Sequence, residues 1–201
     1  MIYNLGAPMT SRIKQHIAET AINLFADRGY HGVSTRDIAK EADVTEGSIY
    51  RIFSTKDALF KETLEIVHRQ SLDAAQFLLM IYESEGKKDR IASLTGAIMR
   101  WYSSLSPAAA RLLLQAYFLE EWREFACGPI NKIMEILSTT LQRGEGIRKG
   151  SKTDFVIAGQ APILALLQFK ITYATSCSAR EENEAVAGIV RHWLGTVLPP
   201  K

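Results

Sequence analysis

The chain has 201 residues, and its 24 Lys and Arg against 22 Asp and Glu give a formal net charge of +2. A hydrophobic share of 47% and a charged share of 23% are ordinary for a soluble globular protein. Residues 1–9 lack the charged start and long apolar core of a secretory signal peptide, and polar residues interrupt the apolar segment 155–171. We therefore expect a cytoplasmic protein with no membrane partner, whose Cys127 and Cys177 are free thiols.

Helical periodicity runs through almost the whole chain, whereas strand signals are nearly absent. We predict an all-α fold of about nine helices. The first helix ends at Gly29. Its apolar face consists of Ile13, Ile17, Ala21, Leu24 and Phe25.

Residues 34–60 predict two short helices, a tight link and the start of a third helix. Ser34 and Asp37 form a capping box at the first short helix, and Thr45 caps the second, which spans 46–53. Ser54 and Asp57 repeat the capping box and open the next helix. Because the link at 43–44 permits only a sharp turn, this segment is a helix-turn-helix whose second helix is short enough for a DNA major groove.

The rest of the chain predicts further helices. The helix that begins near Lys56 continues to about Met80 or breaks near Ser71, and the next helix covers 88–104. Ser106 caps a helix that ends near Phe125. Beyond it we expect a helix over 129–143, a flexible basic loop over 144–152, and helices over 154–175 and 180–197.

The helix-turn-helix carries polar residues where such proteins contact DNA. Residues at the start of the second helix reach base edges, and a glycine there lets the backbone approach the DNA. Hydroxyl groups, cationic side chains and helix starts suit phosphates. The candidates are Ser34, Thr35, Arg36, Thr45, Glu46, Gly47, Ser48, Tyr50, Arg51 and Lys56. Alternatively, these residues form only helix caps and a solvated face.

The string GVSTRDIAKEADVTEGSIYRIFSTKDALF resembles the DNA-binding signature of the TetR family of bacterial one-component repressors. Residues 17–30, IAETAINLFADRGY, resemble the first helix of that family. The resemblance implies a homodimer, a palindromic double-stranded DNA operator, a small-molecule effector, and DNA contacts by Tyr50 and Lys56. The chain departs from the family pattern at Asp43, where glycine is usual, and at Arg51, where an aromatic residue or histidine is common.

No motif for catalysis or metal binding occurs. The four histidines are scattered without ligand spacing, and neither cysteine has an adjacent histidine as a base. We therefore predict no catalytic residue, no metal site and no cofactor.

Aromatic residues gather between the predicted helices 88–104 and 129–143, where they form either plain core or an apolar ligand pocket. The resemblance implies an inducer pocket in this region. Its candidate lining residues are Met99, Trp101, Tyr102, Tyr117, Phe118, Trp122, Met134, Gln168 and Phe169.

The helix 154–175 is apolar nearly all round, so it must be buried on all sides. One side is the core of its own chain, and the other is either more of that core or a second subunit. The resemblance implies that the last two helices pair with their twins in a dimer. The candidate interface residues are Phe155, Ile163, Leu167, Ile189 and Trp193.

These observations favour a two-part repressor. Residues 1–55 bind an operator, while residues 56–201 dimerise and sense a small apolar or aromatic molecule. The alternative is an all-α dimeric ligand carrier or interaction protein that no longer binds an operator. Residues 1–69 support this alternative, because their basic and acidic side chains balance and non-specific DNA affinity comes from excess positive charge.

Overall fold

The computed structural model describes residues 9–84, 90–128, 131, 135, 152–173 and 176–197. Within these ranges the chain forms helices joined by short turns and contains no strand, which confirms the all-α class. The chain divides into two compact units, Met1–Val67 and His68–Lys201. No helix in the described ranges has the length and hydropathy needed to span a membrane.

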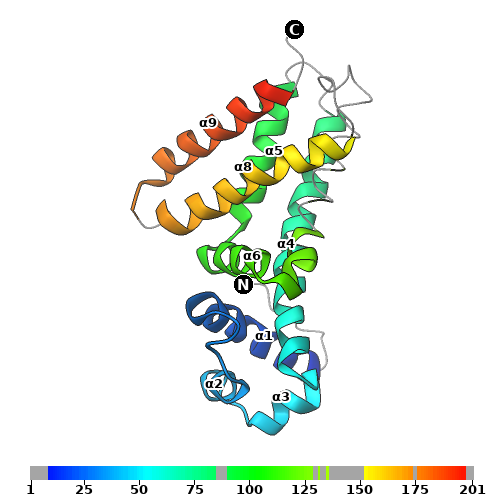
Figure 1. The fold of residues 1–201 in the computed structure, drawn as a ribbon, viewed down its shortest axis with the longest axis vertical. Coiled ribbons are helices and arrows are strands. Elements are labelled where there is room, and N and C mark those ends of the chain that lie inside the picture. The colour runs from blue at the N-terminus through cyan, green and yellow to red at the C-terminus, as the bar shows by residue number, and fades with distance from the viewer. Residues whose placement is uncertain are drawn as a thin grey trace. The chain divides into compact units, whose positions relative to one another are not determined.

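The first unit contains α1 (Met9–Arg28), α2 (Thr35–Glu41), α3 (Glu46–Phe53) and the start of α4 (Lys56–Ser84) (Figure 1). Its core is closed by large side chains that are almost completely buried: Ile17, Phe25, Ile38, Ile49 and Phe60. Of the predicted α1 face, Ile13 is the exception, because 38% of its surface stays exposed. The helix ends as expected at Gly29, which has a φ of 74°.

The turn between α2 and α3 is a Schellman motif. The amide of Val44 donates to the carbonyl of Ala39 at 3.0 Å, and that of Asp43 donates to Lys40 at 3.4 Å. Asp43 itself has a φ of 52°, in the left-handed region that favours glycine but that aspartate tolerates better than most residues. The turn therefore keeps its sharp geometry without a glycine.

The caps of α2 and α3 are confirmed at Ser34 and Thr45. The predicted capping box of Ser54 and Asp57 is wrong. Ser54 has a φ of 61° and donates its amide to Tyr50, so it ends α3. The cap of α4 is Thr55, whose hydroxyl oxygen accepts from the amide of Ala58 at 3.0 Å.

In the second unit α4 continues unbroken to Ser84, so no break occurs at Ser71. The unit also contains α5 (Arg90–Ser104), α6 (Pro107–Phe118), α8 (Lys152–Tyr173) and α9 (Ala179–Val197). Ser106 caps α6 as predicted, but α6 ends at Phe118 and not near Phe125. Leu119 is extended there, and its carbonyl accepts the first hydrogen bonds of a new helical segment, 120–128.

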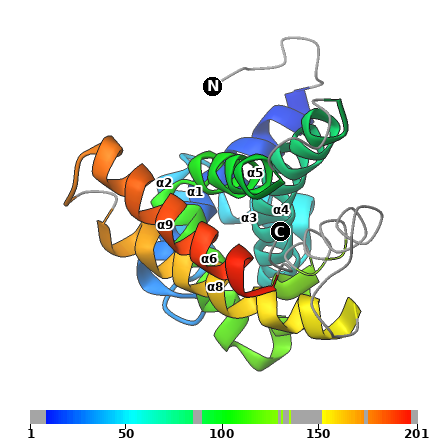
Figure 2. The ribbon, with the colours of Figure 1, turned by 90° about the horizontal axis from the view of Figure 1, so that it is seen from above.

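The helices of this unit pack in pairs, with α6 against α8, α5 against α9, and α8 beside α9 (Figure 2). Trp101, Tyr102 and Leu112 are among the side chains buried between them. Residues 131 and 135 of the predicted helix 129–143 are helical, and the rest of that range lies outside the described residues. Most of the predicted loop 144–152 also lies outside them, and Lys152 already belongs to α8.

His68 is a buried titratable group on α4. Only 8% of the residue is exposed, and its ring stacks on Phe125 with a centroid distance of 5.2 Å. Burial disfavours the charged imidazolium and lowers the pKa of His68 from 6.5 to about 4. The folded protein therefore holds this histidine neutral in a pH range where the unfolded chain protonates it.

We predict that His68 makes the protein sensitive to acid. Its contribution to stability is fully present above pH 6.5 and is lost as the pH falls towards 4, because the unfolded chain then binds the extra proton. His68→Phe keeps the ring contact and should reduce the destabilisation between pH 7 and pH 4.5 by about 2 kcal/mol. Urea unfolding at both pH values measures this.

His192, which is exposed on α9, provides the control. His192→Phe should leave the pH dependence of unfolding as in the wild type. If His68→Phe also left it unchanged, His68 would not be the acid-sensitive group.

Candidate nucleic-acid interface

The start of α2 is fixed by reciprocal hydrogen bonds between Ser34 and Asp37. The amide of Asp37 donates to the Ser34 hydroxyl oxygen at 3.1 Å, while the amide and the hydroxyl of Ser34 both donate to the Asp37 carboxylate, at 2.9 and 2.6 Å. These bonds hold the pKa of Asp37 below its ordinary value. The Asp37 carboxylate is therefore bound to a protein partner, Ser34. It lies on the same helix as Arg36.

The helix α3 presents one apolar and one polar face. Ile49 and Phe53 are buried, as are Ile38 of α2 and Ala42, the C-cap of α2. Val44 is only half-buried. The opposite face exposes Gly47, Tyr50 and Arg51. This arrangement leaves one side of a short helix free for a major groove.

The first residues of α3 are held by their own hydroxyl groups. Thr45 accepts from the amide of Ser48 at 3.2 Å, and the two side-chain oxygens lie 2.8 Å apart. A β-carbon added at Gly47 would meet nothing closer than the Thr45 hydroxyl oxygen at 3.9 Å. The backbone at Gly47 is therefore accessible from outside.

Thr35, Glu46 and Tyr50 form a chain of hydrogen bonds between α2 and α3. The Thr35 hydroxyl donates to Glu46 Oε1 at 2.6 Å, and its oxygen lies 3.1 Å from the Tyr50 hydroxyl oxygen. Thr35 is 6% exposed and Tyr50 is 48% exposed. Thus Thr35, predicted as a DNA contact, lies mostly inside the protein, whereas Tyr50 points outward.

Lys56 stands at the first position of α4 and lies against Tyr30. Its Nζ is 4.3 Å from the centroid of the Tyr30 ring, and the Tyr30 hydroxyl donates to the Asp57 carboxylate. The same ring packs at 4.8 Å from Phe60. Tyr30 was not among the predicted site residues, and an aromatic residue just after the Gly29 stop is the only sequence signal for it.

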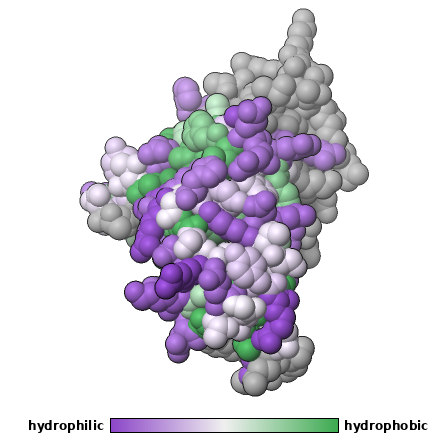
Figure 3. All heavy atoms as spheres, turned by 60° about the horizontal axis from the view of Figure 1, so that its bottom comes forward, coloured by the Kyte–Doolittle hydropathy of each residue, from purple (hydrophilic) through white to green (hydrophobic). Residues whose placement is uncertain are grey.

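Some charged side chains of the first unit form ion pairs, whereas others have no partner among the described residues. Lys14 pairs with Glu62 at 2.6 Å. Arg36 and Arg51 are both exposed and, within the described part of the chain, make no hydrogen bond or ion pair. Figure 3 shows a largely hydrophilic face with scattered apolar residues. Within the described residues, two unpaired guanidinium groups therefore lie exposed on α2 and α3. Two acidic side chains in or next to α2 are exposed as well, Glu41 and Asp43.

The predicted ligand-pocket residues occupy three different environments. Trp101 and Tyr102 are buried, whereas Met99, Tyr117, Trp122 and Phe169 are partly buried. Phe118 is 68% exposed, and Gln168 lies on the surface, where its side chain donates to Thr172 at 3.1 Å. These two side chains therefore do not line the interior of the second unit. Met134 lies outside the described residues.

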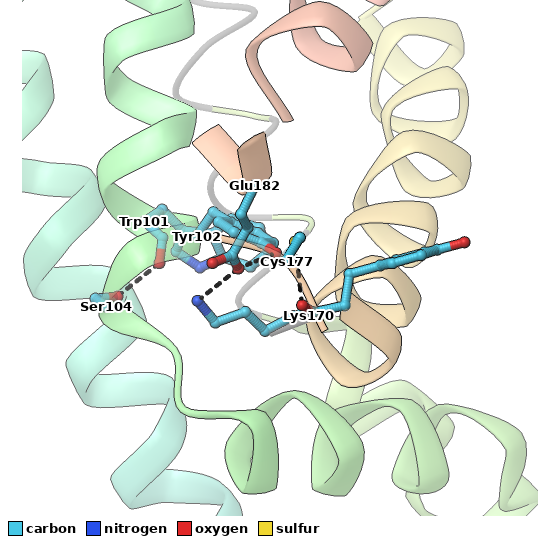
Figure 4. Close-up of polar contacts among 7 residues, drawn as sticks. Trp101, Tyr102, Ser104, Lys170, Cys177 and Glu182 are labelled. Atoms are coloured by element: carbon cyan, nitrogen blue, oxygen red, sulfur yellow. Dashed lines mark hydrogen bonds and ion pairs between the residues drawn. The ribbon is translucent and has the colours of Figure 1, made fainter. Parts of the chain in front are cut away.

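A charged cluster ties α5, α8 and α9 together (Figure 4). Tyr102 donates to Glu182 Oε1 at 2.7 Å, and Lys170 Nζ lies 3.2 Å from the same oxygen. The hydrogen bond from Tyr102, with support from Lys170, holds the pKa of Glu182 below its ordinary value. Lys170 and Glu182 therefore neutralise each other inside the unit.

Of the predicted dimer residues, Ile163, Leu167 and Trp193 are already buried within one chain. They pack in the core of this chain, where they have little exposed area left for a second copy. Ile189 is half-buried, and the side chain of Phe155 lies outside the described residues. The outward side of α8 instead carries Ala161, Leu164 and Ala165, which are exposed or half-buried.

The described residues contain no group of three or more side chains suited to hold a metal ion. Cys127 and Cys177 are free thiols, and burial raises the pKa of Cys127. The candidate site of this chain is the exposed face of α2, α3 and the start of α4, which carries Gly47, Tyr50 and Arg51.

Residues 17–63, which include this face, match the family model described as bacterial regulatory proteins of the tetR family. The regulator AcrR of Shigella flexneri is 43% identical over 53 residues, which are 26% of this chain and 25% of AcrR. This chain covers only 16% to 27% of the length of the relatives that match it over about a quarter of its residues.

A match over most of the chain extends the likeness beyond the helix-turn-helix. The negative transcriptional regulator IcaR of Staphylococcus aureus is 32% identical over 179 residues, 86% of this chain and 91% of IcaR. A TetR-like regulator from Rhodococcus sp. RHA1 has a similar fold, with a TM-score of 0.72 at 16% identity over 94% of this chain and 98% of that one. The sequence, the helix-turn-helix and the all-α fold agree, and this chain belongs to the TetR family of bacterial regulatory proteins.

Proposed function

We propose that this protein is a cytoplasmic transcriptional repressor that binds a palindromic operator as a homodimer and releases it when a small apolar or aromatic molecule binds. The observation that carries the proposal is the exposed face of α3, where Gly47 and Arg51 are free of protein contacts that would block DNA. Lys56 supplies a further cation at a helix start, where amide groups also favour an anion.

The direction of regulation rests on the relative that matches most of the chain. IcaR is described as a negative regulator of the biofilm operon icaADBC. By analogy, we assign repression to this protein, with no inference about which genes it controls. The neutral charge of residues 1–69 supports the alternative, a ligand carrier without an operator, and a gel shift of genomic fragments against non-specific competitor separates the two.

Lys56→Ala should weaken binding to all DNA sequences by a similar factor, because a lysine that neutralises a phosphate carries no sequence information. The slope of the logarithm of the binding constant against the logarithm of salt concentration should fall by about one unit. Fluorescence anisotropy titrations at several salt concentrations measure both quantities.

Lys61→Ala is the matched control, since Lys61 lies on the same helix and pairs with Glu65 at 3.9 Å. This variant should retain the wild-type salt slope. An unchanged affinity and slope for Lys56→Ala would remove Lys56 from the DNA contacts.

We also propose that α8 and α9 form the dimer interface, through the outward residues of α8 and not through its buried ones. Leu164→Arg should give monomers in sedimentation velocity, because an unpaired charge in an apolar interface is costly. Leu167→Arg should instead reduce the folded fraction, since Leu167 is 1% exposed in a single chain. A wild-type protein that sediments as a monomer at micromolar concentration would contradict the dimer.

The proposed effector is uncharged. Among the described residues of the second unit, the buried polar side chains are His68 and Thr95, and the charges of Lys170 and Glu182 are already paired. A charged ligand would find no free counter-charge there. We expect 2-naphthol to release the operator at lower concentration than 2-naphthalenesulfonate, which has the same ring system with a fixed charge.

Gel shifts with graded amounts of each compound provide the comparison, and quenching of tryptophan fluorescence reports direct binding. Equal potency of the two compounds would contradict an uncharged pocket. If no member of a broader panel of apolar aromatic molecules released the operator, the protein would be a ligand-independent regulator.

A further inference from the structure

Three side chains link α2 to α3 by hydrogen bonds, and together they fix which group each hydroxyl proton points to. Thr35 begins α2, Glu46 begins α3, and Tyr50 follows Glu46 by one helical turn on the same face. Thr35 Oγ1 is 2.6 Å from Glu46 Oε1 and 3.1 Å from the Tyr50 hydroxyl oxygen. The Thr35 hydroxyl therefore stands between a carboxylate and a phenol.

The number of protons in this series of hydrogen bonds fixes which group donates and which group accepts each bond. An ionised carboxylate only accepts hydrogen bonds, so the single proton of the Thr35 hydroxyl is donated to Glu46. The distance of 2.6 Å is typical of a hydroxyl that donates to a charged oxygen. In the bond to Tyr50, the Thr35 oxygen can then only accept. The phenolic proton of Tyr50 is consequently directed into the protein.

We infer that Tyr50 meets DNA as a hydrogen-bond acceptor and reads an exocyclic amino group, adenine N6 or cytosine N4, in the major groove. This inference rests on the proposed operator binding. Phosphate oxygens are acceptors only, so they offer nothing to a Tyr50 oxygen whose proton is already used. In the major groove the hydrogen-bond donors of bases are the amino groups of adenine and cytosine.

The burial of Thr35 maintains this arrangement. For Tyr50 to donate to a phosphate, it would have to break its bond to Thr35, whose residue is 6% exposed. Breaking that bond would leave an acceptor site of a largely buried side chain unfilled, which costs free energy. Tyr50 itself is 48% exposed on the helix expected to enter the groove, so its remaining acceptor capacity faces outward.

This direction of the hydrogen bonds changes the role expected for each of the three residues. Residue type alone places Tyr50 among the phosphate contacts, whereas the structure assigns it to base selection. Thr35 and Glu46 become positioning residues, because they orient the Tyr50 hydroxyl and need not touch DNA themselves.

The test begins with selection of an operator from a randomised library by the wild-type protein. Binding constants are then measured for operators in which each base pair is replaced in turn. Tyr50→Phe should reduce discrimination at one base pair of each half-site by roughly two- to tenfold, the size of a single neutral hydrogen bond. Discrimination at other positions and the salt slope should stay unchanged.

Thr35→Val and Thr35→Ser form a matched pair. Valine keeps the shape but removes the hydroxyl, which returns the phenolic proton to Tyr50, so the preference at that base pair should move towards bases that present acceptors, guanine or thymine. Serine keeps the hydroxyl and should retain the wild-type profile. Circular dichroism and urea unfolding of each variant check the fold, and Tyr50→Phe alters an exposed side chain, so it decides the question alone if Thr35→Val unfolds.

Uniform weakening by Tyr50→Phe across all operator variants would make Tyr50 a phosphate contact and overturn this inference alone, with the proposed function intact. An unchanged base preference in a folded Thr35→Val protein would do the same. A wild-type protein that selects no operator would overturn both.

Discussion

An eight-residue helix is too short to be stable in water by itself, so the position of α3 depends entirely on what holds it. At its start, the Schellman turn and the Thr45 cap fix the direction in which it leaves α2. Along its length, Ile49 and Phe53 are buried in the core of the first unit. Apolar contacts on the opposite side of α3 therefore fix the position of its polar face. The proposed DNA-contacting residues on that face depend on the same contacts for their position.

The surface charge of the first unit depends on which of its acidic side chains are already bound to protein partners. Asp37 receives the hydrogen bonds of a capping box, Glu62 pairs with Lys14, and Asp57 accepts from Tyr30. Acids used in this way still count in a sum of formal charges, but they are oriented towards protein partners. Exposed Arg36 and Arg51 lack such partners among the described residues. A unit with balanced formal charge can thus still offer unpaired guanidinium groups, which are the kind of group that binds phosphates.

Local features of the fold were predictable because their causes are local. The caps at Ser34 and Thr45 and the Gly29 stop each depend on a few consecutive residues. The start of α4 near Lys56 was predicted correctly, but its cap was assigned to Ser54 and not to Thr55. Serine and threonine are both good caps, and only the positive φ of Ser54 decides between them.

What could not be predicted depends on contacts between distant residues. The bond from Thr35 to Glu46 and the stacking of Lys56 on Tyr30 join positions whose spacing along the chain carries no periodic signal. The same holds for α8, because an apolar residue at nearly every position shows that the helix is buried without showing which side faces its own core. Burial of Ile163 and Leu167 within one chain settles that side.

Because α4 is continuous, it provides a physical route by which the proposed ligand could affect DNA binding. One helix runs from Lys56, beside the proposed DNA contacts, through His68, which lies in the second unit and stacks on Phe125. A helix of 29 residues with intact hydrogen bonds transmits a displacement along its axis more readily than a flexible linker. The ligand nevertheless shifts the balance between two states only by its difference in affinity for them. A molecule that binds both states equally well would leave the proposed operator bound, however tightly it binds.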